Sequence, residues 1–561
     1  MSESLKEAKI LESARTAGGI SKLYSYSKIS GPGIWIALAA LSAGSLVGSL
    51  GIGQKLGTDG LWIQAWAMVL GMFSLWTVSH IALNSQQNLF SLLRNEWNPS
   101  LGWWLAGSAM ITNFAWCMPQ FRFGADITGT CLLPFLDHKI GKISIAFVIL
   151  ACSIFLSFWY EKSGFRSKLI QWLLRAMLWS LLAMLVYATV ITHTNSSASA
   201  TEILSGFIPS MNHFNEVSPC FETLLEKTGE YRSFWEPLLL DQQRELALIT
   251  FSSTLGVNLL FALPLMLLGR GWKRRHNGFA KFNLFVGLLI PFVICSSCLT
   301  LLSSEGFKKY AGEIPSPESL SHDDLQQTGE ILSQRLIYEM GRDNFEKLPP
   351  FEQDNRFKNL SIDEHLLAHS LLPFSVQQWV KSLSKGHPTL KYVLGASVLL
   401  ISFSTIVILM ILNGHLFCEV LNKPHRGAPF QSGSLILALS SVGPFILSDQ
   451  DNWVADPSYI LSLAILPFAL LSFLLMLNSK EILGRECPKG LGGWSVNLGA
   501  CLSFLCLGSS SFYLAWNQKW GSFPIGQLLV ILIGVLVLVG YFSLKIKKLS
   551  NRISGLETRM D

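Results

Sequence analysis

Long apolar blocks recur along this chain, and no other feature limits its fold as strongly. Each block runs for about 19–25 residues, the length that an α-helix needs to cross a hydrocarbon core of roughly 30 Å. In lipid every backbone N–H and C=O must be satisfied internally, so isolated spans of this kind are helices. We predict twelve spans, at 33–53, 60–82, 102–125, 143–160, 168–192, 246–269, 282–303, 391–414, 430–448, 457–478, 492–515 and 523–545.

The composition agrees with a single large membrane domain. Half of the 561 residues are hydrophobic, only 14% are charged, and the mean hydropathy is +0.40. A soluble protein of this size needs more charge to cover its surface. The first thirty residues are polar and carry charges of both signs, so we expect the first apolar block to be a permanent span.

Lysine and arginine gather in alternate loops, which predicts the topology. With the N-terminus inside, the cytoplasmic segments hold most of them, and the short external loops hold almost none. This bias requires an even number of spans and places both termini in the cytoplasm. We expect an integral protein of a bacterial inner (plasma) membrane. The cytoplasmic basic residues are Lys22, Lys28, Lys162, Arg166, Lys168, Arg270, Lys273, Arg274, Arg275, Lys281, Lys423, Arg426, Lys480, Arg485, Lys489, Lys545, Lys547, Lys548 and Arg552.

The loops and spans together predict a division of the chain. Residues 304–390 form a polar insertion with mixed charges and helical stretches such as Ile331–Met340, which favours a helical cap over a catalytic module. The predicted segments are a cytoplasmic tail (1–30), spans 1–5 (31–192), an external loop (193–245), spans 6–7 (246–303), the external insertion (304–390), spans 8–10 (391–478), spans 11–12 (479–545) and a cytoplasmic tail (546–561).

Two spans contain residues that interrupt a helix. Span 1 has the sequence SAGS at 42–45, and span 6 has Gly256, Asn258 and Pro264. They are five spans apart, the period of a five-plus-five inverted repeat, whose substrate lies between two interrupted helices. Small residues also serve close helix packing, and a lone Asn can bond a neighbouring helix, so this alternative stays open. The candidate substrate-binding residues are Ser42, Ala43, Ser45, Val257 and Asn258, with Ala43 and Val257 contributing backbone carbonyls.

Ionisable residues at membrane depth are rare and therefore informative. Arg122 and Asp126 are four residues apart near the outer end of span 3, so they share a helix face and can pair. The pair is either structural or part of a proton or coupling-ion pathway. No His/Cys/Asp/Glu cluster has metal-site spacing, and nucleophile or nucleotide-binding motifs are missing. We expect no enzyme, no cofactor and no nucleic-acid partner.

Several segments together resemble the Nramp family of proton-coupled divalent metal transporters, which have a LeuT-like fold. GPG at 31–33 followed by SAGS at 42–45 is similar to the family's GPG and Asp-Pro-Gly-Asn motifs. The segment 125–131 (ADITGTC) resembles its helix 3. The segments 161–169 (EKSGFRSKL) and 201–211 (TEILSGFIPSM) resemble its linkers, and 466–484 (LPFALLSFLLMLNSKEILG) resembles its helix 10. The resemblance covers roughly 31–300 and 390–490, and implies two C-terminal helices beyond the repeat.

The chain departs from the family at the metal ligands. The family's Asp and Asn of helix 1 align with Ser42 and Ser45, its Met-Pro-His with 260–262 (Leu-Phe-Ala), and its helix 10 Gln with Ile465. Only Asp126 matches the family's proton pathway. A dehydrated divalent cation needs anionic or several good oxygen ligands, so this site suits a less dehydrated ion better.

Three functions follow from this reading. The first is an Nramp-like secondary transporter of a divalent cation with altered selectivity, working by alternating access, with the proton as the candidate coupling ion. The second is a transporter of the same fold for a neutral or zwitterionic solute such as an amino acid. The third is a membrane protein with a degenerate site that transports nothing.

Overall fold

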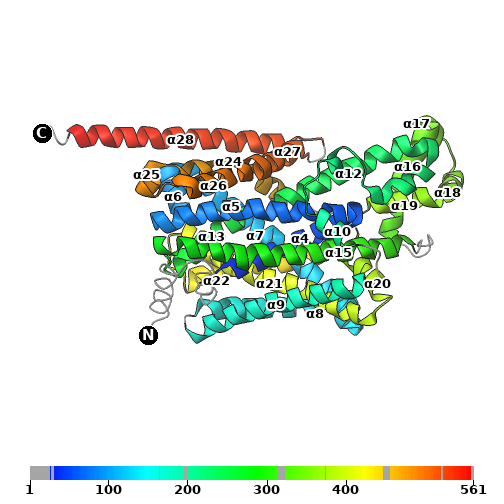
Figure 1. The fold of residues 1–561 in the computed structure, drawn as a ribbon, viewed down its shortest axis with the longest axis horizontal. Helices are drawn as coiled ribbons and strands as arrows, with labels where there is room; N and C mark the ends of the chain where they lie inside the picture. The colour runs from blue at the N-terminus through cyan, green and yellow to red at the C-terminus, as the bar shows by residue number, and fades with distance from the viewer. Residues whose placement is uncertain are drawn as a thin grey trace.

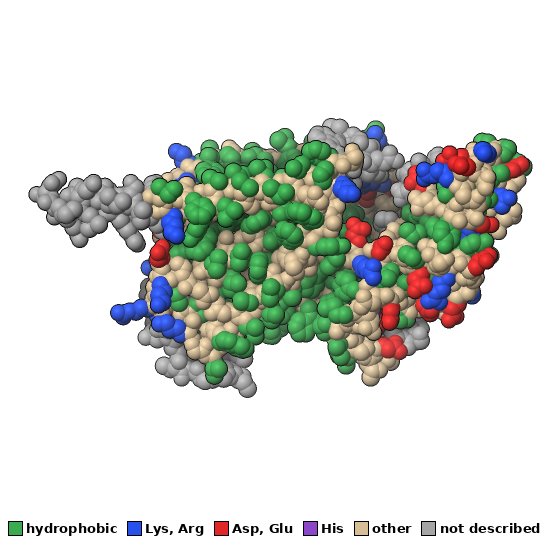
Figure 2. Space-filling model, turned by 90° about the horizontal axis from the view of Figure 1, so that it is seen from above, with side chains coloured by type: hydrophobic (Ala, Val, Ile, Leu, Met, Phe, Trp, Pro, Cys, Tyr) green, Lys and Arg blue, Asp and Glu red, His purple; other side chains and the backbone are tan. Residues whose placement is uncertain are grey.

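The chain is built almost entirely from helices that run side by side (Figure 1). The computed structural model describes residues 26, 31–162, 164–194, 199–312, 322–372, 374–446, 455–519 and 522–557. In these ranges, nine helices are long and apolar enough to cross a membrane, and one bent helix pair makes a tenth candidate. Figure 2 shows a broad hydrophobic band between two charged ends. The predicted class, an all-α integral membrane protein, is confirmed.

The first half of the bundle begins with a broken helix. Its two parts, α3 (Gly33–Ala40) and α4 (Ala43–Lys55), are followed by four unbroken helices. These are α5 (Leu61–Ser85), α7 (Pro99–Ile127), α8 (Lys139–Glu161) and α9 (Phe165–His193).

The second half begins with another interrupted helix, made of α12 (Arg232–Ser253) and α13 (Val257–Gly269). The helices that follow are α14 (Asn277–Leu284), η8 (Phe285–Leu289), α15 (Ile290–Gly312), α21 (Pro388–Val420), α22 (Ala428–Ile436) and α24 (Ala455–Leu477). The chain then continues through α26 (Gly490–Ser503), η12 (Phe504–Gly508), α27 (Ser509–Asn517) and α28 (Ile525–Glu557).

Every predicted block falls on helical structure, but two of them are not among the span candidates. Block 102–125 is α7, which is long enough yet less apolar because Thr112, Asn113 and Gln120 are buried in it. Block 430–448 corresponds to the short α22 and the turns after it. Its end and the acidic loop 448–453 lie at 447–454, outside the described residues.

Several helices extend past the predicted membrane boundaries. Helix α12 starts at Arg232, inside the predicted external loop 193–245, and α15 runs on to Gly312. Helix α28 continues to Glu557, inside the predicted tail 546–561. Hydropathy marks the stretch within lipid, whereas a helix continues into water wherever polar helix-forming residues follow.

The insertion 304–390 folds into short helices at one end of the bundle (Figure 1). They are α16 (His322–Met340), α17 (Arg342–Glu346), α18 (Pro350–Asn359), α19 (Ile362–Leu371) and α20 (Val376–Ser384). Capping boxes start α19 and α20, in which Ser361 and Ser375 pair reciprocally with Glu364 and Gln378. We call these five helices the cap.

The basic loops meet at the opposite end of the bundle. Arg274 Nη2 lies 2.5 Å from Glu486 Oε1, and His80 Nε2 lies 3.1 Å from the Glu486 carbonyl. The Gly427 amide donates to Glu161. Arg274, Gly427 and Glu486 belong to the loops after spans 6, 8 and 10, and His80 and Glu161 lie at the helix ends that lead into the loops after spans 2 and 4. These loops share one end of the bundle (Figure 1), as the charge bias predicts.

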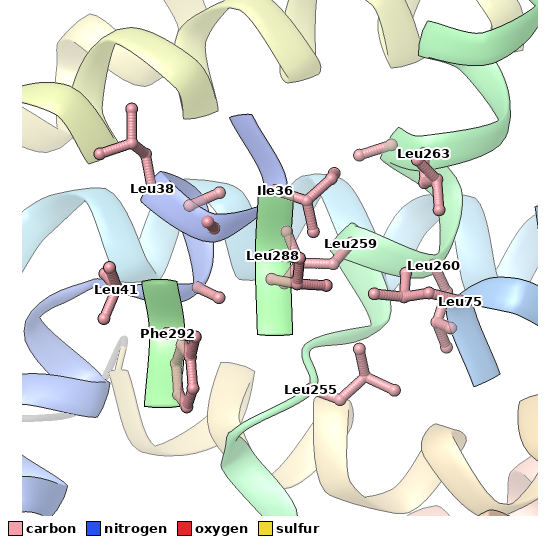
Figure 3. Close-up of a cluster of buried hydrophobic side chains, with 14 of the residues drawn as sticks. Ile36, Leu38, Leu41, Leu75, Leu255, Leu259, Leu260, Leu263, Leu288 and Phe292 are labelled. Atoms are coloured by element: carbon pink, nitrogen blue, oxygen red, sulfur yellow. The ribbon is translucent and has the colours of Figure 1, made fainter. Parts of the chain in front are cut away.

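Apolar side chains surround both interrupted helices. In Figure 3, Leu288 and Phe292 lie between Leu41 of the first helix and Leu255 of the second. All four side chains are buried in the main core. This packing keeps lipid away from the backbone groups that each interruption exposes.

Candidate functional site

The first interruption bends its span strongly. Helices α3 and α4 meet at an angle of 58°, and Ser42 between them has extended backbone (φ −100°, ψ 179°). Thr405 of α21 donates a hydrogen bond to the carbonyl of Leu38 (3.2 Å) and lies 3.4 Å from that of Leu41. A neighbouring helix thus satisfies carbonyls that the end of α3 leaves free.

The second interruption is a three-residue link, Thr254-Leu255-Gly256, between α12 and α13. Gly256 is extended (φ −76°, ψ 146°), and the Asn258 side chain folds back so that its Oδ1 accepts the Leu259 amide at 3.0 Å. A Cβ at residue 256 would lie 2.2 Å from Asn258 Oδ1. A side chain at this position would therefore displace the Asn258 amide, which covers the start of α13.

A small cavity lies between the two interruptions. Its volume is about 40 Å³. A cavity needs about 10–15 Å³ to hold one water, whose share of liquid volume is about 30 Å³, so there is room for about one to three water molecules. The lining residues are Ala39, Ala40, Ser42, Gly44, Ser45, Gln64, Trp116, Thr250, Ser253, Thr254, Gly256, Asn258, Leu259, Thr405 and Leu409.

The cavity wall is polar and carries no charged side chain among the lining residues. Gln64 of α5 donates to the Ser45 carbonyl (3.1 Å) and accepts from Ser49 (2.7 Å), so its amide orientation is fixed. Ser45 Oγ donates to the Ser42 carbonyl at 2.9 Å. Thr250 differs from these, because its hydroxyl is buried without a hydrogen-bond partner in the described part of the chain. A ligand in the cavity would satisfy that hydroxyl.

A chain of side-chain amides leads away from the cavity. Asn258 Nδ2 donates to Asn113 Oδ1 of α7 at 2.9 Å, and Asn113 Nδ2 lies 3.4 Å from Asn413 Oδ1 of α21. Asn413 in turn donates to the Gly433 carbonyl of α22 at 2.7 Å. Asn113 and Asn413 are at most 1% exposed, so water cannot bond to their side chains. The hydrogen bonds within the chain of amides satisfy these buried polar groups instead.

The structure brings three of the five predicted substrate-binding residues to the cavity. Ser42, Ser45 and Asn258 line it. Ala43 and Val257 are buried at the first turns of α4 and α13 and do not line it. Each begins a half-helix and packs into the protein instead.

The positions aligned with the family's remaining ligands lie in apolar packing. Leu260, Phe261, Ala262 and Ile465 are all buried, and none of them lines the cavity. Figure 3 shows Leu260 beside Leu75 of α5. In the described part of the chain, no three His, Cys, Asp or Glu residues are grouped closely enough to hold a metal ion.

The predicted pair at the outer end of α7 has a third member. Arg122 Nε lies 3.6 Å from Asp126 Oδ2, and Lys142 Nζ of α8 lies 3.2 Å from Asp126 Oδ1. Lys142 also pairs with Asp137 at 3.1 Å. The Asp126 side chain is 22% exposed, and none of these residues lines the cavity.

Sequence reasoning missed several cavity residues. Gln64, Thr250, Thr405 and Trp116 come from four different helices, so only the fold brings them together. A signal was nevertheless present, because a polar residue inside an apolar block, such as Gln64 or Asn413, is costly in lipid and needs an internal partner.

Comparisons with known proteins add to this description. No family model matches the sequence. Over 186 residues the chain is 26% identical to "Metal transporter Nramp2" of Oryza sativa subsp. japonica, which is 32% of each protein. The matched part thus spans about a third of that relative's length.

Solved structures match over almost the whole chain. A mutant of the Eremococcus coleocola manganese transporter has a TM-score of 0.62 at 14% identity, covering 94% of this chain and 96% of that one. The same transporter in complex with an aromatic bis-isothiourea substituted compound gives 0.60 at 16% identity, with the same coverage. Sequence and fold therefore both support the resemblance that the motifs predicted: the chain is similar to the Nramp transporters and has their LeuT-like fold.

Proposed function

We propose that this protein is a secondary active transporter that carries a small, partly hydrated cation through the cavity by alternating access. The substrate is bound between the interruptions of spans 1 and 6, as in other inverted-repeat transporters. The protein lies in a plasma membrane, the inner membrane of a bacterium, with both termini in the cytoplasm. The predicted segment boundaries belong to this proposal.

One observation carries the proposal. A cavity with room for about one to three water molecules lies between two helix interruptions and is lined by hydroxyl, amide and backbone groups. Such a volume suits an ion with one or two waters better than a drug-sized solute, whose pockets are typically about 300–1,000 Å³. The similar proteins are a metal transporter and a manganese transporter, which favours a metal cation.

The residues that line the cavity also favour a metal selectivity different from that of the Nramp family. A bare Mn²⁺ or Fe²⁺ would lose its hydration without gaining a carboxylate or thioether ligand in return. Mg²⁺ dehydrates reluctantly and usually keeps several waters when bound. An uncharged, oxygen-rich cavity therefore favours a hard ion such as Mg²⁺ that retains part of its hydration shell.

Asp126 and Arg122 are the proposed coupling element. The carboxylate pairs with two cations, Arg122 and Lys142, at the outer end of α7 and is partly exposed to solvent. Coupling of this kind predicts that uptake depends on pH through Asp126.

A second function is favoured by the same uncharged lining. A neutral or zwitterionic solute the size of the smallest amino acids needs no charged ligand, and the N-termini of α4 and α13 could hold a carboxylate. The third function, a degenerate site, would be expected to show continuous helices without a cavity. Both spans are interrupted, which speaks against it.

The test is uptake into proteoliposomes loaded with a magnesium-sensitive dye. Mg²⁺ uptake should depend on the protein and fall at least tenfold in a Ser42→Ala/Asn258→Ala double variant. A matched control is Ser495→Ala, an exposed serine of α26 that bonds only its own helix backbone. Absence of uptake for Mg²⁺, Mn²⁺, Fe²⁺ and monovalent cations alike would overturn the proposal, and uptake of an amino acid would establish the second function.

A further inference from the structure

The cap touches both outer half-helices that border the cavity. Helix α4 leads from the first interruption toward the cap, and α12 leads from the cap toward the second interruption (Figure 1). In an inverted-repeat transporter, such half-helices must separate from the rest of the bundle to open the cavity on their side. The contacts between the cap and these helices therefore decide whether that side can open.

The contact with α4 is centred on Gln54. Its Nε2 donates to the carbonyls of Ser370 (3.1 Å) and Leu372 (2.9 Å), and its Oε1 accepts the Phe374 amide at 3.2 Å. Gln54 is 3% exposed, so all three bonds are shielded from water. A buried glutamine with its donors and acceptor all engaged holds the segment after α19 in one position on α4.

The contact with α12 combines an ion pair and an apolar core. Arg335 Nε lies 2.5 Å from Glu364 Oε1, and both side chains are almost fully buried. The same carboxylate oxygen lies 3.4 Å from Trp235 Nε1 of α12. Around this group, apolar side chains of α11 (Pro219–Lys227) and α12 pack against those of α16 and α19, including Leu239, Leu332 and Leu367.

The cap also reaches helices on the other side of the cavity. Helix α20 packs against α15 and α21, and its Trp379 is fully buried. A Cβ at Gly306 of α15 would lie 3.1 Å from Ser382 Oγ of α20. Since α21 supplies Thr405 and Leu409 to the cavity wall, the cap bridges helices from both sides of the cavity.

We propose that the cap is a gate strap, which holds α4 and α12 against α15 and α21 and must release Gln54 before the cavity can open on the cap side. This inference rests on the proposed transport function, since a gate needs a site to cover. It assigns a role to the insertion 304–390, for which the family resemblance offers no counterpart.

The test measures access to the cavity rather than transport. A Ser45→Cys variant, in a Cys220→Ser background, is labelled with a membrane-impermeant thiol reagent added on the cap side. Gln54→Ala should raise the labelling rate about tenfold, because the strap then loses its three hydrogen bonds to α4. Arg342→Ala, an exposed cap residue paired only loosely with Glu346 at 3.9 Å, should leave the rate unchanged. An equal rate in the Gln54→Ala and parent proteins would overturn the proposal.

A second variant tests the proposal independently, in case Gln54→Ala disturbs folding. A Gly306→Cys/Ser382→Cys pair is close enough for a disulfide, in which the Cβ atoms are about 3.5–4.5 Å apart. Oxidation should fix α20 to α15 and lower Ser45→Cys labelling at least fivefold, and a reductant should restore it. Equal labelling of the oxidised and reduced proteins would also refute the strap. Because labelling requires no transported substrate, these outcomes are independent of whether uptake is found.

Discussion

The cavity and the cap touch the same two broken helices but use opposite chemistry. Around the cavity, polar groups are uncharged, and one buried hydroxyl, that of Thr250, has no partner in the described part of the chain. In the cap, Arg335 and Glu364 form a buried ion pair, and Gln54 has its amide fully bonded. The cavity keeps a polar group unpaired where a ligand could bind, whereas the buried residues that join the cap to the broken helices, Gln54, Arg335 and Glu364, have hydrogen-bond partners.

The largest effect expected from this contrast is on the cap. Arg335→Ala leaves the buried Glu364 carboxylate unpaired and should destabilise the protein by about 3 kcal/mol. Limited proteolysis and thermal unfolding in detergent measure this loss. Arg342→Ala removes an exposed pair and should cost less than about 0.5 kcal/mol. Equal losses in the two variants would mean that the buried pair contributes no more than a surface pair.

The amide chain should respond next most strongly. Asn113→Ala removes one partner from both Asn258 and Asn413, and leaving buried amides unpaired should cost about 2–3 kcal/mol. The melting temperature should fall accordingly. Asn517→Ala is the control, since this exposed side chain bonds only the Tyr513 carbonyl of its own helix. A wild-type melting temperature in Asn113→Ala would show that water replaces the lost bonds.

Substitution of Thr250 should lower the affinity for the ligand while leaving the stability of the protein almost unchanged. In Thr250→Val the unpaired hydroxyl becomes a methyl of similar size, so stability should change by less than about 0.5 kcal/mol. Cation affinity should fall about fivefold, as expected for losing one neutral ligand contact worth about 1 kcal/mol. Titration with Mg²⁺ while following tryptophan fluorescence, with Trp116 in the cavity wall, measures the change. An unchanged affinity would exclude Thr250 from the ligand set.

Only a small change in stability is expected at Asp126 as well. Its pairs with Arg122 and Lys142 are partly exposed, so Asp126→Asn should cost less than about 1 kcal/mol. The proposed coupling role instead predicts a change in how uptake depends on external pH. A pH profile identical to that of the parent would leave Asp126 with a purely structural role.

Much of the fold could be predicted because membrane insertion imposes strong rules on sequence. Span lengths and the Lys/Arg bias marked the apolar helices of the bundle, and SAGS at 42–45 and Gly256 marked the two interruptions, whereas Pro264 lies inside α13 and does not interrupt it. The ends of α12 and α28 could not be found this way, since hydropathy reports the lipid boundary and not the end of hydrogen bonding.

The site was only partly predictable. Ser42, Ser45 and Asn258 follow from the position of the interruptions. Gln64 and Thr405 depend on which faces of α5 and α21 turn inward, and these helices bury most of their circumference. Without an amphipathic pattern, the inward face cannot be read from residue spacing.

The most direct test of the central claim is thermal stability of the purified protein across a panel of cations and neutral solutes. A ligand at 100 times its dissociation constant stabilises the folded state by about 2.7 kcal/mol. The account predicts that Mg²⁺ raises the melting temperature by several degrees, that Mn²⁺ and Fe²⁺ raise it less, and that Ser42→Ala/Asn258→Ala abolishes the shift. Stabilisation by an amino acid but by no cation would contradict it.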